Sequence, residues 1–227
     1  EDVKDLKEAQ EAAKDIGFPL LIKARSGGGG RGIRKVEKME DLKGAFSTAA
    51  QEAKVNFNNP ALYMEKLLTQ VKHVEVQVLC DQKGHAVSFL ERDCSMQRKH
   101  QKILEESPCV LLTPPQRTKL ARYARQAAKA LKYEGVGTLE FLMDQQGNFF
   151  FLEMNTRLQV EHPVTELVSG VDLVKWQIRV AAGIELPFQQ KDLPASGHAI
   201  ECRINAEDPA RDFAPAGGTV DILHVPG

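Results

Sequence analysis

GVGTLEFLMDQQGNFFFLEMNTRLQVE, residues 135–161, carries the clearest structural signal in the chain. Two hydrophobic runs end in Glu140 and Glu153, and the QQGN turn between them predicts an antiparallel hairpin. Pairing would bring the two carboxylates close enough to repel unless a cation bridges them. Asn155 adds an oxygen ligand in register with Glu153, so the segment predicts a Mg²⁺ or Mn²⁺ site. The alternative is two outward-facing carboxylates on a hydrated sheet face.

The loop that follows this hairpin carries groups suited to a small oxyanion. The guanidinium of Arg157 can hold such an anion, and the carboxylate of Glu161 can move its proton. His162 is a possible metal ligand, but a histidine before a proline and a helix is more often a capping or packing residue.

A glycine-rich loop, SGGGGRG at residues 26–32, precedes these elements. Consecutive glycines let backbone N–H groups approach an anion closely. The loop matches neither GxxxxGK[ST] nor a GxGxxG that opens a helix, which excludes a P-loop and leaves a dinucleotide fold unsupported. A flexible hairpin tip is the alternative. Lys23 favours an anion site, because a lysine inside an apolar strand usually needs an anionic partner.

Three further segments carry candidate ligand groups. MEKLL offers backbone groups for an adenine edge and Glu65 for ribose hydroxyls, although exposed Glu–Lys pairs are usually solvated. ERDCSMQRKHQK, residues 91–102, predicts an irregular basic loop that faces the acidic strand ends across a metal–triphosphate; the alternative is a surface charge run. Arg203, inside the apolar strand AIECRIN, is expected to pair with an anion.

The hydrophobic periodicity predicts an α+β fold dominated by antiparallel hairpins. Helices are expected at residues 3–16, 40–54, 113–131, 164–170 and 171–183, and HAVSFLERDCS is expected to form one strand. The glycine-loop region and the larger sheet are expected to act as a mobile lid over a fixed base.

Composition excludes several classes of protein. The 227 residues hold 30 lysines and arginines against 31 acidic residues, which argues against a general nucleic-acid or anionic-membrane surface. No apolar run approaches the roughly 20 residues of a membrane span, and no signal peptide is recognisable. The four cysteines are scattered, so neither zinc nor disulfides are expected and a reducing compartment is predicted. Neither end reads as a finished terminus, so we expect part of a longer polypeptide.

Several motifs together resemble the biotin carboxylase subunit or domain of the biotin-dependent carboxylases, an ATP-grasp family that includes acetyl-CoA, propionyl-CoA and pyruvate carboxylases. They are GGGGRG, MEKLL, HVEVQVL, ERDCSMQRKHQK, GTLEFL, FLEMNTRLQVEHPVTE and ECRINAEDP, and they extend over essentially the whole chain. The resemblance implies an ATP-grasp fold truncated at both ends. Residues 1–66 would be the lid, residues 67–190 the base with the metal and bicarbonate site, and residues 191–227 the start of a C-terminal domain.

The same resemblance implies a reaction, cofactors and partners. Bicarbonate would carboxylate carrier-bound biotin through carboxyphosphate, using ATP and two Mg²⁺ or Mn²⁺ ions. A biotin carboxyl carrier domain, a carboxyltransferase and, at full length, a second copy of the chain are the expected partners, with no nucleic acid or membrane. The expected location is the cytoplasm, or the mitochondrial matrix in a eukaryote, and acetyl-CoA carboxylase of fatty acid biosynthesis is among the implied enzymes.

Position by position, the resemblance also assigns roles to residues. Those implied to bind nucleotide are Lys23, Gly29, Gly30, Glu65, Lys66, Leu68, His73, Gln97, His100 and Leu142. Those implied to bind metal, and with it the nucleotide, are Glu140, Glu153 and Asn155. Those implied to hold bicarbonate are Lys102, Arg157, Gln159 and Val160, with Glu161 as the base. Arg157 would also act on carboxyphosphate, and Arg203 would stabilise the enolate of biotin. Lys102, Arg157, Glu161 and Arg203 thus form the expected catalytic set.

Two other functions stay open. One is a different ATP-grasp bicarbonate or carboxylate ligase, such as a carbamoyl-phosphate or purine-pathway enzyme. The other is a non-catalytic nucleotide-binding or assembly module.

Overall fold

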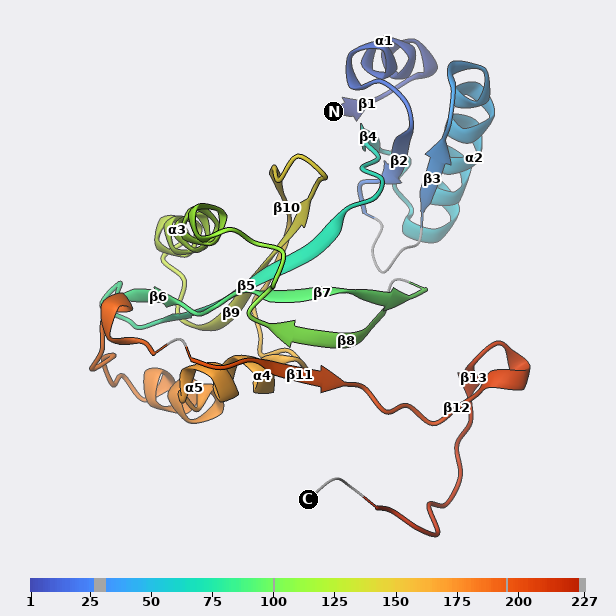
Figure 1. Ribbon diagram of the computed structural model, residues 1–227. Helices are drawn as coiled ribbons and strands as arrows, with labels where there is room; N and C mark the ends of the chain where they lie inside the picture. The colour runs from blue at the N-terminus through green and yellow to red at the C-terminus, as the bar shows by residue number, and fades with distance from the viewer. Residues whose placement is uncertain (27–31, 100, 195, 225–227) are drawn as a thin grey trace. The chain divides into compact units, whose positions relative to one another are not determined.

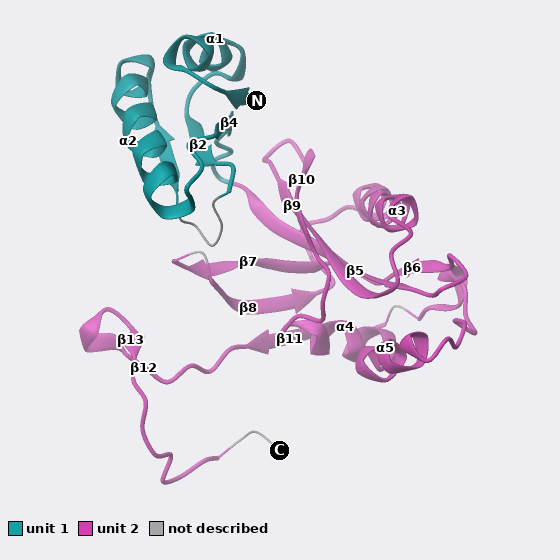
Figure 2. Cartoon of the chain, turned by 180° about the vertical axis from the view of Figure 1, so that it is seen from behind, with its two compact units in different colours: residues 1–70 teal, residues 71–227 magenta. Residues whose placement is uncertain are grey.

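A computed structural model gives the fold and describes residues 1–26, 32–99, 101–194 and 196–224 (Figure 1). The chain divides into two compact units, unit 1 from Glu1 to Gln70 and unit 2 from Val71 onward (Figure 2). Both contain antiparallel sheets and helices, which is the α+β organisation that the sequence predicts. Within the described residues, none of the helices combines the length and apolar character of a transmembrane span.

Unit 1 is a four-stranded antiparallel sheet with two helices. Its elements are β1 (Asp2–Val3), α1 (Leu6–Ile16), β2 (Leu20–Ala24), β3 (Ile33–Val36), α2 (Met39–Phe57) and β4 (Leu62–Lys66). The strands lie in the order β1-β4-β2-β3. Leu20, Ile22 and Ala24 of β2 are buried among the helix side chains, because successive residues of a strand point to opposite faces.

Helix α1 begins later than the predicted helix at residues 3–16. The Asp5 side chain accepts a 2.9 Å hydrogen bond from the backbone N–H of Glu8 and so caps the first turn. Val3 belongs to β1 and pairs with Leu62 of β4. Val3 fits the helical spacing, but it is excluded from the helix because it pairs with β4 and because the Asp5 cap starts the helix after it. Gly17 ends the helix as predicted, at a φ of 72°.

Unit 2 is built on a larger antiparallel sheet. Its strands are β5 (Lys72–Cys80), β6 (Ala86–Ser88), β7 (Arg92–Arg98), β8 (Gln101–Ser107), β9 (Gly135–Met143), β10 (Phe149–Asn155) and β11 (Ala199–Cys202). They lie in the order β10-β9-β5-β7-β8-β11, and β6 also pairs with β5. The helices are α3 (Pro114–Ala130), α4 (His162–Ser169) and α5 (Leu173–Ala181). The remaining short elements are η1 (Gln190–Asp192), β12 (Glu207–Asp208), η2 (Pro209–Arg211) and β13 (Ala214–Pro215).

Different helices cover the two faces of this sheet (Figure 1). Val74, Val76 and Val78 of β5 pack with α3 in the main apolar core. Glu75 and Gln77, which alternate with them, are completely buried on the opposite face. That face lies on the side of α4 and α5. Because β5 is buried on both faces, the polar side chains on one face have no access to water. They therefore need hydrogen-bond or ion-pair partners inside the protein.

Two segments differ from their predicted structure. HAVSFLERDCS does not form a single strand, because β6 ends at Ser88 and β7 begins only at Arg92. Within its described residues, the basic segment at 91–102 is mostly strand rather than loop, although its pairing is irregular between Asp93 and Gln97. It supplies β7 and the start of β8, whose pairing places Gln97 opposite Lys102. The pairing of β7 with β8 therefore fixes the backbone position from which the Lys102 side chain extends.

Leu139→Ala should lower the free energy of unfolding of unit 2 by about 2–5 kcal/mol, because the side chain is 1% exposed in the core under α3. The matched change Leu167→Ala, at a side chain that is 74% exposed, should cost no more than about 0.5 kcal/mol. Urea denaturation followed by the fluorescence of Trp176, the single tryptophan of the chain, measures both. Equal losses for the two variants would contradict this placement of the core.

Candidate active site

Polar side chains of β5 and β9 form a buried layer on the face of the sheet opposite α3. Their pairing sets Glu75 opposite Glu140 and Gln77 opposite Thr138. Glu75, Gln77 and Thr138 are fully buried, and Glu140 is 5% exposed. Two carboxylates that face each other out of water repel and lose hydration, so this layer must contain cations.

Arg92 is the first of these cations, and it is completely buried. Its Nε donates to Glu75 Oε1 at 2.6 Å, and Nη1 donates to Gln77 Oε1 and Thr165 Oγ1, both at 2.9 Å. Its Nη2 donates to Thr138 Oγ1 at 3.2 Å and Gln159 Oε1 at 3.1 Å. All five N–H donors of the guanidinium are therefore used.

Lys102 is the second cation, and its ammonium group contacts three carboxylates. Nζ donates to Glu75 Oε2 at 2.6 Å, to Glu161 Oε1 at 2.7 Å and to Glu140 Oε1 at 2.8 Å. Burial opposes the charged form, but the negative charges of Glu75 and Glu161 outweigh it and raise the pKa of Lys102. Lys102 therefore joins carboxylates from β5, from β9 and from the N-terminal boundary of α4.

Arg203 holds the other side of Glu161. Its Nη2 donates to Glu161 Oε2 at 2.9 Å, and its Nε donates to Glu105 Oε1 at 2.6 Å. The carboxylate of Glu161, in a residue only 2% exposed, thus lies between an ammonium and a guanidinium. Arg203 pairs with protein carboxylates, which is one of the two kinds of anion that its apolar strand predicts.

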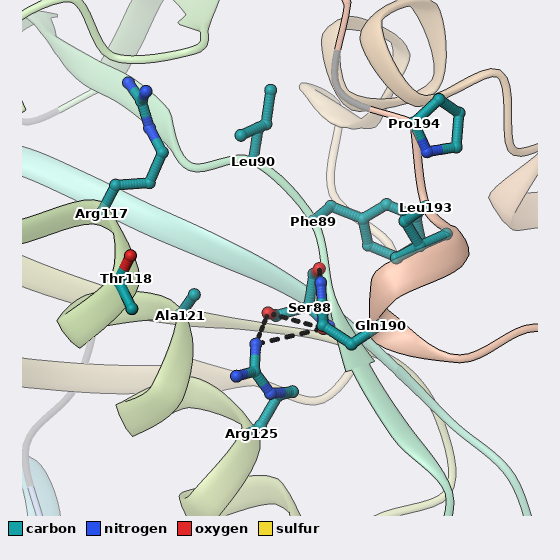
Figure 3. Close-up of a pocket in the computed structure, with 10 residues that line it drawn as sticks. All are labelled: Ser88, Phe89, Leu90, Arg117, Thr118, Ala121, Arg125, Gln190, Leu193 and Pro194. Atoms are coloured by element: carbon teal, nitrogen blue, oxygen red, sulfur yellow. Dashed lines mark hydrogen bonds between the residues drawn. The ribbon is translucent and has the colours of Figure 1, made fainter. Parts of the chain in front are cut away.

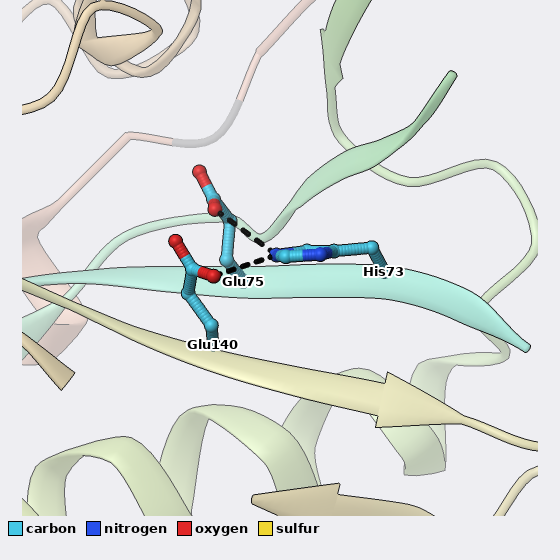
Figure 4. Close-up of side chains that lie close together, drawn as sticks. All are labelled: His73, Glu75 and Glu140. Carbon is cyan, nitrogen blue, oxygen red and sulfur yellow. Dashed lines mark ion pairs between the residues drawn. The ribbon is translucent and has the colours of Figure 1, made fainter. Parts of the chain in front are cut away.

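The ring of His73 points toward the carboxylates of both Glu75 and Glu140 (Figure 4). Its Nε2 is 3.0 Å from Glu140 Oε2 and 3.6 Å from Glu75 Oε2. Burial opposes the charged ring, but contact with the two carboxylates outweighs it and raises the pKa of His73 to about 9. Among the described residues Nε2 makes no hydrogen bond of standard geometry, but both carboxylates lie close enough to attract a protonated ring. Gln97 Nε2 lies 3.2 Å from His73 Nδ1, a contact that suits the neutral ring better than the protonated one.

We call this group the polar cluster: His73, Glu75, Arg92, Lys102, Glu105, Glu140, Gln159, Glu161 and Arg203. It contains four carboxylates but three permanently charged cations, Arg92, Lys102 and Arg203. A proton on His73 would make the charges equal. This inequality explains why the pKa of His73 is raised in spite of its burial.

Two amides, one at the end of β10 and one in the loop after it, bind Glu140. Asn155 Nδ2 and Gln159 Nε2 both donate to Glu140 Oε1, at 2.9 and 2.8 Å. Arg157 is exposed and donates to Asn155 Oδ1 at 3.3 Å and to the backbone carbonyl of Leu158 at 3.2 Å. The side chain of Val160 is 58% exposed. The side chain of Arg157 is therefore accessible to a ligand, while hydrogen bonds to Arg92 and Glu140 hold Gln159 in place.

A β-bulge sets the position of the predicted metal ligands. Phe151 pairs with Phe141, but two residues later Glu153 pairs with Glu140, so Leu152 is the extra residue. Without this shift Leu152 would face Glu140. Paired residues of a sheet project to the same face, and two carboxylates with the Asn155 amide are oxygen donors of the kind that Mg²⁺ binds. The donor set fits a divalent cation, although Glu153 is exposed.

Two other groups of three residues bring possible metal-ligand atoms close together. Among the described residues, ligand atoms of His73, Glu75 and Glu140 lie within 4.8 Å of one another, and so do those of Glu75, Cys94 and Glu161. Both groups already have Lys102 as an internal counter-ion. Glu153 belongs to neither group.

The remaining predicted site residues are not members of the polar cluster. Lys23 forms an ion pair with Glu65 inside unit 1, and Lys66 Nζ donates to the backbone carbonyl of Phe18 at 2.7 Å. Leu68 is half-buried in the same unit. Leu142 pairs with His73 across β9 and β5. Gly29, Gly30 and His100 lie outside the described residues.

Sequence reasoning missed Glu75 and Glu105, and it placed Arg92 in a basic loop facing the acidic strand ends without giving it a role of its own. A usable signal was present for Glu75, which alternates with valines in HVEVQVL. A carboxylate at such a position either faces water or needs a buried cation, the argument already applied to Lys23. No comparable local signal marks Glu105, because its partner Arg203 is distant in sequence.

Comparison with known proteins places this site in a family context. The family model described as carbamoyl-phosphate synthase L chain, ATP binding domain, matches residues 1–189. The 2-oxoglutarate carboxylase small subunit of Hydrogenobacter thermophilus is 50% identical over 225 residues, which make up 99% of this chain and 48% of that protein. The biotin carboxylase of Haemophilus influenzae is 51% identical over 98% of this chain and 49% of its own length. The chain thus spans about half the length of the curated relatives it matches.

A solved structure matches the fold as well. It is the biotin carboxylase domain dimer of the H. thermophilus 2-oxoglutarate carboxylase, in complex with MgADP, ADP and bicarbonate. The TM-score is 0.89 at 50% identity, over 99% of this chain and 49% of that one. This similarity confirms the predicted ATP-grasp fold and the resemblance to biotin carboxylases.

Arg92→Met should lower the free energy of unfolding by about 3–5 kcal/mol, because it leaves the buried carboxylate of Glu75 with only one of its two cationic partners. Chemical denaturation measures this loss. Arg122→Met, at an exposed position of α3, removes the same charge and should cost no more than about 0.5 kcal/mol. A loss below about 1 kcal/mol for Arg92→Met would show that the network does not hold the fold together.

The charge of His73 should contribute stability that is complete below pH 6.5, the ordinary histidine pKa, and that disappears as the pH rises through about 9. The free energy of unfolding should therefore fall between pH 7 and 9.5, and His73→Gln should flatten that fall. NMR titration of the His73 ring protons gives the pKa directly. A midpoint at or below 6.5 would instead assign the neutral ring that the Gln97 contact favours.

Proposed function

The chain belongs to the family of the carbamoyl-phosphate synthase L chain ATP-binding domain, and we propose that it supplies the bicarbonate-activating site of a biotin carboxylase. In this reaction ATP phosphorylates bicarbonate to carboxyphosphate, which delivers CO₂ to biotin on a carrier domain. The observation that carries the proposal is the setting of Glu161. Its buried carboxylate is held by Lys102 at 2.7 Å and by Arg203 at 2.9 Å, so a base stands between two groups able to bind anions.

Each of these residues has a role that its chemistry supports. Lys102 and Arg157 would bind the negative charge of bicarbonate, with Gln159 and Val160 beside them. Glu161 would take the proton of the bicarbonate hydroxyl, and the resulting oxyanion would attack the γ-phosphorus of ATP as ADP leaves. Arg203 would offset the negative charge that develops on the biotin oxygen when its N1 is deprotonated.

The nucleotide and metal assignments are part of the same proposal. The nucleotide-binding residues would be Lys23, Gly29, Gly30, Glu65, Lys66 and Leu68 of unit 1, with His73, Gln97, His100 and Leu142 of unit 2. Glu140, Glu153 and Asn155 would hold two divalent ions, Mg²⁺ or Mn²⁺, which supply positive charge to the phosphates. Residues 1–66 would act as the lid, residues 67–190 as the base, and residues 191–227 as the start of a further domain.

The wider assembly follows from the same reaction. A biotin carboxyl carrier domain must present biotin, and a carboxyltransferase must use the carboxylated product. The full-length protein is proposed to form a homodimer in the cytoplasm or the mitochondrial matrix. The final carboxyl acceptor would be an acyl-CoA or a keto acid, including acetyl-CoA for fatty acid biosynthesis.

Glu161→Gln should lower biotin-dependent ATP hydrolysis by about 10²- to 10⁴-fold in the full-length protein that contains this chain, because the amide cannot accept the bicarbonate proton. The matched variant Glu134→Gln, at an exposed loop position, should retain the wild-type rate. Phosphate release with and without biotin and bicarbonate measures both effects.

Two outcomes would point to the alternative functions. ATP hydrolysis that depends on bicarbonate but is indifferent to biotin would indicate another ATP-grasp ligase. MgATP binding by calorimetry without any phosphate release, unchanged in Glu161→Gln, would indicate a nucleotide-binding module.

A further inference from the structure

Unit 2 contains a cavity that the proposed reaction does not use. It has a volume of about 280 Å³ and lies between α3, the segment after β6 and the segment that begins with η1 (Figure 3). No residue of the polar cluster lines it. The volume is just below the roughly 300–1,000 Å³ of ordinary small-molecule sites. A ligand of this cavity would therefore be smaller than a nucleotide.

The charges of the cavity are unequal. Its lining contains two arginines and no carboxylate. Arg117 already has partners, since its Nε donates to Glu91 Oε1 at 2.8 Å and its Nη2 donates to the backbone carbonyl of Cys109 at 3.1 Å. Arg125 has no carboxylate partner among the described residues. One positive charge of the cavity is thus left without a counter-ion.

Neutral groups fix the guanidinium of Arg125 in place. Its Nη1 donates to Ser88 Oγ at 2.7 Å and to Gln190 Oε1 at 3.1 Å (Figure 3). Gln190 is itself held on both sides, because its Oε1 accepts from the backbone N–H of Ser88 and its Nε2 donates to the Ser88 carbonyl, both at 2.8 Å. Within the part of the chain that the structure describes, Nε and Nη2 of Arg125 make no hydrogen bond. These two atoms form an edge of the guanidinium that matches the two oxygens of a carboxylate.

The rest of the lining is mainly apolar. Phe89 and Leu193 form one wall, and Ala121 of α3 leaves space on another (Figure 3). Arg125 is half-buried, so its charge is less hydrated than at an exposed position, and this burial lowers the pKa of its guanidinium. Reduced hydration strengthens the attraction for an anion.

We propose that this cavity binds a small organic carboxylate, with the carboxylate on the free N–H donors of Arg125 and a short apolar group among the apolar residues of the lining. The single unpaired charge matches a monoanion better than a phosphate dianion. The site is independent of the proposed biotin carboxylase reaction, so either assignment can fail without the other.

Butyrate is the probe, and butyramide is its uncharged control of the same shape. NMR titration of the arginine Nε–H signals in the full-length protein should show butyrate binding, with butyramide at least about tenfold weaker. Arg125→Gln should weaken butyrate binding by at least about tenfold. Arg122→Gln, which removes an exposed charge of the same helix outside the cavity, should leave it unchanged.

Ala121→Leu provides a second test that keeps the charge of Arg125. The larger side chain narrows the cavity and should weaken butyrate binding, while circular dichroism checks that each variant is folded. No butyrate binding by the wild-type protein, or binding that Arg125→Gln and Ala121→Leu both retain, would overturn the proposal. Equal affinity for butyrate and butyramide would also overturn it, because the charge would then have no part in binding.

Discussion

The buried pair of Arg92 and Glu75 is the interaction on which the polar cluster depends. Taking two charges out of water costs several kcal/mol per ion, so such a pair adds little net stability. Its effect is to fix positions. One guanidinium joins β5, β9, α4 and the loop that carries Gln159. Gln159 is therefore placed by the sheet as much as by its own loop, which gives an exposed loop the precision that a binding site requires.

Lys102 adds a second constraint, because one ammonium group serves three carboxylates. Its three N–H donors are all used, so an oxyanion that binds Lys102 must take donors from Glu75, Glu140 or Glu161. Those carboxylates then need another cation, and a divalent ion at Glu140 would supply the charge. In the proposed reaction, binding of the oxyanion and of the metal–nucleotide would thus favour each other through the electrostatics of a single lysine.

Local signals were enough to predict much of the fold. The alternation in HVEVQVL and the Thr113-Pro114 start of α3 correspond to β5 and to the helix that begins at Pro114. Failures came where a distant partner decides the structure. Val3 pairs with a strand about 60 residues later in the chain, and the bulge at Leu152 is defined only by its pairing with β9. Neither the partner nor the register can be read from the periodicity of one segment, because both depend on how the whole sheet assembles.

The candidate site shows the same division. Glu140 lies within a strand that the sequence predicts and Glu161 directly precedes a helix, and sequence reasoning selected both. Arg92 looks like any other member of a charge run until the sheet is assembled, when β7 places it beside Glu75. A charged residue in an exposed run and a charged residue in a buried network have the same local sequence. The two cases differ in whether the residue at the paired position of the neighbouring strand carries the opposite charge. Sequence alone therefore allows one check, which is whether each buried carboxylate has a cation that could pair with it. Glu75, which alternates with valines, requires such a cation, and the strands β7 and β8 carry Arg92 and Lys102.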